Sequence, residues 1–118
     1  MSNSIYDLEE RTLIFAKDVR KFVRKLKKDI PNLEDSRQLV NSSGSVGANY
    51  IEANESLSKK DFVMRIKICR KEAKESSYWL NLIYAEDDSS LEKERIRLFK
   101  EAKELTSIFG AIYRKSEV

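Results

Sequence analysis

The chain has 118 residues, of which 41% are hydrophobic and 36% are charged, and its formal net charge is +3. This composition is too apolar for a disordered chain, and no apolar run is long enough to span a bilayer. The N-terminus MSNSIYDLEE lacks the features of a secretory signal, and the single cysteine cannot form an internal disulfide. We therefore expect one cytoplasmic domain with no membrane partner.

Apolar and small side chains recur at spacings of three and four in two segments of the N-terminal half, which is typical of a helix face buried against other helices. The first such seam consists of Leu8, Thr12, Phe15, Val19, Phe22 and Leu26. The second seam consists of Leu39, Ser43, Val46, Tyr50, Ala53 and Leu57. The lone proline, Pro31, separates the two segments.

The C-terminal half repeats the pattern twice. The third seam consists of Phe62, Ile66, Cys69, Ala73, Ser76, Leu80 and Ile83. The fourth seam consists of Leu91, Leu98, Ala102, Leu105, Phe109 and Ile112. With only three glycines and one proline, the chain is poorly suited to a turn-rich β architecture.

Each segment also opens with a short polar residue followed three positions later by an acid, as in a capping box. The pairs are Ser4–Asp7, Asn32–Asp35, Ser58–Asp61 and Ser89–Glu92. Seams and start signals together predict helices over 4–28, 33–57, 58–86 and 90–115. Because the connections are short, we expect an all-α, up-down, antiparallel and left-handed four-helix bundle over residues 1–118.

The second helix has the weakest propensity, since it contains NSSGSVGANY. A phosphate-binding loop would need Gly-Lys-Ser/Thr, whereas Ala48 and Asn49 follow Gly47. We favour a structural interpretation in which Gly44, Gly47 and Ala48 let another helix approach closely.

The side-chain inventory argues against common catalytic chemistry. The chain has no histidine, so a di-iron bundle with Glu-x-x-His motifs and an ordinary Cys/His zinc site are both excluded. Cys69 occupies a seam position and is predicted to be a buried small apolar group rather than a nucleophile. We predict a protein without catalytic residues, cofactor or metal.

Charge is distributed unevenly along the chain. Residues 4–28 carry eight Lys/Arg against four Asp/Glu, and residues 33–57 carry one against four. A basic stripe opposite the first seam consists of Lys17, Arg20, Lys21, Arg24 and Lys28. Such a stripe can contact phosphates of RNA or DNA, although solvated helix faces give the same pattern.

A second polar set adjoins the seams of the two middle helices. Its members are Ser45, Asn49, Glu52, Arg70, Glu72 and Glu75. Polar groups beside a core usually pair with each other or with a neighbouring subunit, so we predict a structural network or a subunit interface rather than a catalytic site.

Several motifs resemble those of the bacterial four-helix-bundle proteins encoded in intervening sequences of 23S ribosomal RNA genes. They are Leu8-x-x-Arg11-x-x-x-Phe15-Ala16, Ser45-x-x-x-Asn49-x-x-Glu52, Ser58-x-x-Asp61-Phe62 and Arg70-Lys71-Glu72-Ala73-x-Glu75-Ser76-x-x-Trp79-Leu80. One common form of the pattern has Glu-Gly where this chain has Glu52-Ala53. The resemblance covers nearly the whole chain.

The resemblance implies an up-down bundle that assembles as a homo-oligomer, with a pentamer expected, and an association with RNA through gene location. It implies no known activity. A similar fold occurs in the accessory protein of diversity-generating retroelements, which partners a reverse transcriptase and nucleic acid. The competing hypotheses are therefore a nucleic-acid-associated bundle, a protein-interaction scaffold and a helical nuclease, the last disfavoured by the missing histidine.

Overall fold

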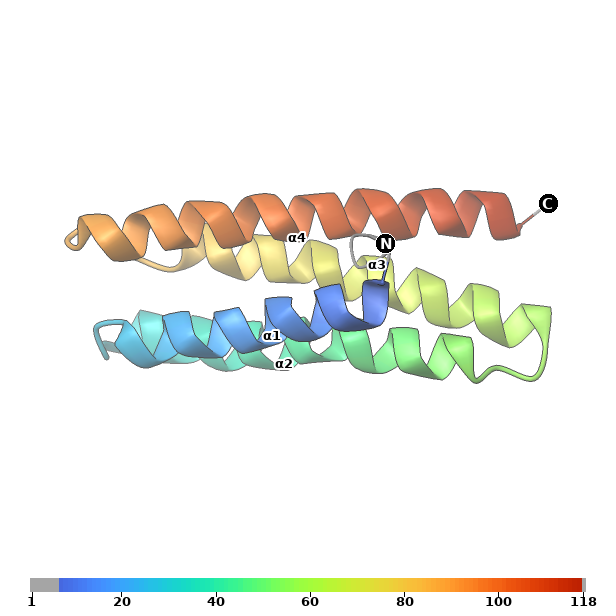
Figure 1. Ribbon diagram of the computed structural model, residues 1–118. Coiled ribbons are helices and arrows are strands. Elements are labelled where there is room, and N and C mark those ends of the chain that lie inside the picture. The colour runs from blue at the N-terminus through green and yellow to red at the C-terminus, as the bar shows by residue number, and fades with distance from the viewer. Residues whose placement is uncertain (1–6, 118) are drawn as a thin grey trace.

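The computed structural model describes residues 7–117, which form four helices and no strand. The helices are α1 (Leu8–Lys25), α2 (Ile30–Asn54), α3 (Lys59–Leu82) and α4 (Ser89–Ser116). Consecutive helices run antiparallel through short connections, with α1 and α2 side by side below α3 and α4 in Figure 1. The bundle is elongated, with principal extents of 47 × 32 × 19 Å. The predicted all-α up-down bundle is confirmed.

The core follows the predicted seams closely. Every seam residue of α1 is buried, as are the central residues of the other three seams. Tyr50 of α2 reaches Phe109 of α4 in an edge-to-face contact with ring centroids 5.5 Å apart. The exception is Leu57, which is fully exposed because α2 ends at Asn54. The prediction that the second seam extends to Leu57 is therefore wrong.

Aspartates cap three of the four helices. Asp7, Asp29 and Asp88 accept hydrogen bonds from the first-turn N–H groups of α1, α2 and α4, and Ser58 caps α3 as predicted. The capping boxes expected at Asn32 and Ser89 are therefore wrong. Ser4 lies outside the described residues. Since Asp29 caps α2, the helix starts before Pro31, whose ring is tolerated in a first turn.

Asn32 is 2% exposed and links the α1–α2 connection to the α3–α4 connection at one end of the bundle. Its side-chain amide donates to the carbonyl oxygens of Lys27 (3.1 Å) and Tyr84 (3.0 Å). Its Oδ1 accepts from the backbone N–H of Tyr84 at 3.0 Å. These three bonds satisfy backbone groups that neither helix ladder can reach.

The glycines of α2 lie against α1, as the structural interpretation predicts for Gly44 and Gly47. A Cβ on Gly47 would lie 2.8 Å from Thr12 Oγ1 and 3.2 Å from Thr12 Cβ. A Cβ on Gly44 would meet only the end of the Arg20 side chain, at 3.2 Å. Ala48, by contrast, is exposed. The close approach of α1 and α2 is therefore centred on Gly47.

Candidate nucleic-acid interface

The basic stripe runs along the outer surface of α1. Its exposed members are Lys17, Lys21, Arg24 and Lys28. None of these four takes part in a hydrogen bond or ion pair within residues 7–117. Lys17, Lys21 and Arg24 follow at spacings of four and three on one helical face, and Lys28 lies just beyond the end of α1. Their charges are thus free to meet an anionic partner.

Arg20 behaves differently from the rest of the stripe. It is half-buried, and its guanidinium donates to the carbonyl oxygens of Ala16 (3.1 Å) and Val40 (3.5 Å). The same group covers Gly44. Its stem and head therefore pack α1 against α2, a role that the sequence pattern did not reveal.

Asn49 is the member of the second polar set that forms a hydrogen bond across the α2–α3 interface. Asn49 donates to the carbonyl of Ser45 at 2.9 Å and accepts a hydrogen bond from Arg65 Nη1 at 2.9 Å. Arg65 was not among the sequence candidates, although it directly precedes the seam residue Ile66. Glu52 is exposed one turn further along α2.

The α3 members of the set are not joined to Asn49 or Glu52 by any hydrogen bond or ion pair within residues 7–117. The Arg70 guanidinium lies 5.8 Å from the ring centroid of Tyr113 on α4. Glu72 lies 3.8 Å from Lys71 Nζ, and burial together with the nearby Glu75 carboxylate raises the pKa of Glu72. Within residues 7–117 of the single chain these side chains make several local contacts, and their predicted role at a subunit interface stays a prediction.

Cys69 is fully buried between α3 and α2, and its thiol donates to the carbonyl of Val46 at 3.4 Å. Burial raises the pKa of Cys69 to about 12. Since the thiolate is the nucleophilic form, this side chain is inert in the folded protein.

Polar contacts join α1 to α4. Arg11 forms a bidentate pair with Glu101 at 2.7 and 2.8 Å and a further contact with Glu104 at 2.8 Å. Nearer the other end of α1, Asp18 accepts a hydrogen bond from Arg97 at 2.9 Å. Hydrogen bonds to Glu94 first, and then to Asp18, raise the pKa of Arg97. The contact between α1 and α4 is therefore charged at the protein surface, whereas the core beneath it is apolar.

None of the helices in residues 7–117 combines the length and apolar character needed to cross a membrane. Within the same residues, no group of three or more Cys, Asp or Glu side chains is arranged to hold a metal ion.

Comparison with known proteins identifies a family and similar solved structures. The family model described as 23S rRNA-intervening sequence protein matches residues 6–111. A crystal structure of a protein of unknown function from the S23 ribosomal protein family of Bacteroides thetaiotaomicron VPI-5482 is 28% identical, with a TM-score of 0.73. The match covers 89% of this chain and 96% of that one. No curated protein matches. On this basis the chain belongs to the 23S rRNA-intervening sequence protein family.

Proposed function

We propose that this protein is a non-enzymatic, homo-oligomeric bundle that binds RNA or DNA through phosphate contacts made by the stripe on α1. The observation that carries the proposal is the row of exposed cations at Lys17, Lys21 and Arg24, none of them neutralised within residues 7–117. The family description, which refers to an intervening sequence of 23S rRNA, supports an association with RNA.

Contacts of this kind position a protein on nucleic acid without reading its sequence. Lys17 and Lys21 are one helical turn apart, about 6 Å along the axis at ~1.5 Å per residue. Arg24 continues the row and can donate two parallel hydrogen bonds to one phosphate. No aromatic side chain interrupts this outer row, so we expect little base stacking and little preference among sequences.

Reversing two charges of the stripe tests the proposal. The variant Lys21→Glu/Arg24→Glu should bind structured RNA at least about tenfold more weakly in a gel-shift titration, because it replaces two attractive phosphate contacts with repulsion. The matched control, Lys60→Glu/Lys74→Glu, reverses two exposed charges on α3 and should weaken binding far less. Equal binding by both variants would rule out the stripe as the contact surface.

The non-enzymatic part of the proposal rests on the residues themselves. The chain has no histidine, and its only thiol is buried with a pKa of about 12. Neither the family description nor the matched structure names an activity. RNA cleavage by the pure protein that is lost in Glu75→Gln would overturn this part of the proposal.

Homo-oligomerisation, with a pentamer as the expected form, is supported by large apolar side chains on the surface of the single chain. Those at least 48% exposed are Leu13, Ile14, Ile30, Leu33, Ile51, Leu57, Met64, Tyr78, Leu82 and Tyr84. Apolar side chains that are exposed on a single chain become buried where copies of it pack together, and this burial stabilises an assembly. Light scattering should give five times the monomer mass, and a purely monomeric species at micromolar concentration would contradict the assembly.

The alternative is a protein-interaction scaffold, such as an accessory protein for a reverse transcriptase. Tyr78 favours it, since this side chain is 59% exposed and stacks edge-to-face on Trp79 with centroids 5.0 Å apart. Exposed aromatic pairs are common anchors of protein interfaces. A single protein partner that is retained after nuclease treatment and lost in Tyr78→Ala would favour the scaffold over the nucleic-acid interpretation.

A further inference from the structure

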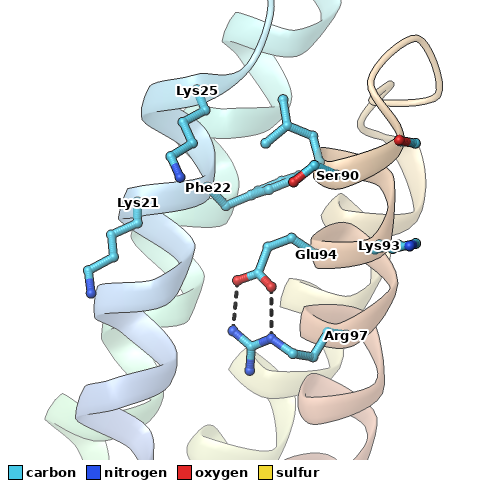
Figure 2. Close-up of a pocket in the computed structure, with 9 residues that line it drawn as sticks. Lys21, Phe22, Lys25, Ser90, Lys93, Glu94 and Arg97 are labelled. Atoms are coloured by element: carbon cyan, nitrogen blue, oxygen red, sulfur yellow. Dashed lines mark hydrogen bonds and ion pairs between the residues drawn. The ribbon is translucent and has the colours of Figure 1, made fainter.

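A hollow of about 500 Å³ opens between the C-terminal half of α1 and the first turns of α4. Figure 2 shows Lys21 and Lys25 on the α1 wall and Glu94 and Arg97 on the α4 wall. Phe22 and Leu91 form part of its apolar lining. The volume lies within the range of sites that hold small ligands.

The rim of the hollow is cationic. Lys21, Lys25, Lys93 and Arg97 line it, and the Asp88 carboxylate lies at its edge, bonded to the N–H groups of the lining residues Ser90 and Leu91. The other carboxylates nearby are Glu94 and Asp18. Both carboxylates are already bonded to Arg97. Within residues 7–117 the three lysines have neither an ion pair nor a hydrogen bond, and four cations against three carboxylates leave one positive charge in excess at the rim.

The Arg97 guanidinium is held by hydrogen bonds from Nε and Nη2 to two carboxylates, whereas Nη1 donates to neither of them. Its Nε and Nη2 donate to the two oxygens of Glu94 at 2.8 and 2.7 Å, and Nη2 also donates to Asp18 at 2.9 Å. Nη1 has no acceptor within residues 7–117, and the side chain is 53% exposed. The two N–H groups of Nη1 therefore remain to donate to an anion, although the parallel pair that binds phosphate in a bidentate way is already used by the carboxylates.

The backbone at the start of α4 is not the anion site, because the Asp88 carboxylate already accepts from the N–H groups of Ser90 and Leu91. An anion in the hollow must be held by side chains. In Figure 2 the Lys21 side chain extends away from α4 and the Lys93 side chain extends away from α1, so both must turn on their flexible stems to reach a ligand in the hollow.

We propose that the hollow between α1 and α4 holds one nucleotide unit of the bound strand, with its phosphate between the lysines of α1 and the Lys93–Arg97 edge of α4. The half-buried Leu91 would then pack against the sugar or base, while Phe22, which is 2% exposed, closes the hollow from the core side. This inference rests on the proposed function and adds three cationic residues, Lys25, Lys93 and Arg97, that lie outside the predicted stripe.

Three double variants of the full chain separate this proposal from the stripe proposal. Lys25→Gln/Lys93→Gln removes two charges from the hollow, Lys17→Gln/Arg24→Gln removes two from the stripe alone, and Lys74→Gln/Lys100→Gln removes two exposed charges elsewhere on α3 and α4. All of these side chains are exposed, so each variant is expected to fold, which circular dichroism would verify.

Binding of a structured RNA is then measured for each protein over a salt series. The hollow variant should bind about tenfold more weakly, and its slope of log affinity against log salt should fall by about 1 to 2, while the control stays within about twofold of wild type. A hollow variant that matches the control, while the stripe variant is impaired, would overturn the hollow and leave the proposed function intact. If the wild-type protein bound no RNA at every salt concentration tested, both the hollow proposal and the proposed function would be wrong.

Discussion

Replacing Asn32 with aspartate is expected to lower the free energy of unfolding by about 3–5 kcal/mol at neutral pH, which is typical of an uncompensated buried charge. The second carboxylate oxygen would take the place of the amide nitrogen that now donates to the carbonyls of Lys27 and Tyr84. Oxygen would then face oxygen at a site that is 2% exposed. Urea unfolding monitored by circular dichroism measures the loss.

The same variant should show a characteristic pH dependence. Burial and the two carbonyls raise the pKa of the introduced carboxyl above its unfolded value of ~3.9. The destabilisation is therefore complete above the folded-state pKa and shrinks as the pH falls through it, because the protonated acid can donate one hydrogen bond. Loss of stability that is independent of pH would contradict this account.

Asn49→Asp is the matched control for this substitution. Asn49 is half-buried; a carboxylate there loses the hydrogen bond to the Ser45 carbonyl but gains a cationic partner, because Oδ1 already accepts from Arg65 at 2.9 Å. We expect its stability to stay within about 1 kcal/mol of wild type. If Asn32→Asp and Asn49→Asp lowered the free energy of unfolding by similar amounts, burial and hydrogen-bond partners would not explain the loss at Asn32.

Replacing Gly47 with alanine is expected to destabilise the bundle even though alanine is the better helix former. The new Cβ would lie 2.8 Å from Thr12 Oγ1. Thr12 is fully buried, and its hydroxyl is bonded to the Leu8 carbonyl at 2.6 Å, so it cannot turn away. Overpacking costs typically about 1–3 kcal/mol, which exceeds or offsets the roughly 1 kcal/mol of helix propensity gained.

Gly44→Ala provides the comparison within the same helix. Its Cβ would lie 3.2 Å from Arg20 Nη2, whose bond to the Val40 carbonyl is long at 3.5 Å, so a small shift of this flexible side chain makes room and we expect a gain below ~1 kcal/mol in urea unfolding. Combining Gly47→Ala with Thr12→Ala should recover part of the loss, because the hydroxyl at 2.8 Å is removed. A Gly47→Ala protein at least as stable as Gly44→Ala would show that α1 and α2 do not pack tightly here.

The helical period was sufficient to predict the core, because a face buried against other helices must repeat every three or four residues. It located the seam of α2 despite poor propensity, since burial of Leu39 and Val46 outweighs the cost of two glycines. The period could not locate the end of α2. Leu57 continues the spacing but lies beyond the last helical residue.

Helix starts were harder to predict, because several polar residues in succession can each act as a cap. Asp29 and Asn32 are both good N-caps, and the sequence does not reveal that the Asn32 amide is engaged by Tyr84, 52 residues away. Asp88 and Ser89 present the same ambiguity. In both cases the earlier residue caps the helix, which lengthens it at its start.

The candidate interface was predictable only where it lies on one helix. The exposure of Lys17, Lys21 and Arg24 follows from their place opposite the seam. The hollow could not be found in this way, because Lys25 and Lys93 come together only when α4 packs beside α1. Nor does spacing indicate that Arg20 bonds to Val40 rather than facing solvent.

The salt dependence of RNA binding by the wild-type protein tests whether the exposed cations of the stripe on α1 contact phosphates. If exposed cations contact phosphates without reading bases, log affinity should fall linearly with log salt, with a slope of about −0.7 to −0.9 per phosphate contact. Two structured RNAs of unrelated sequence should give the same slope and similar affinity. No binding at low salt, or binding indifferent to salt, would contradict the proposed function.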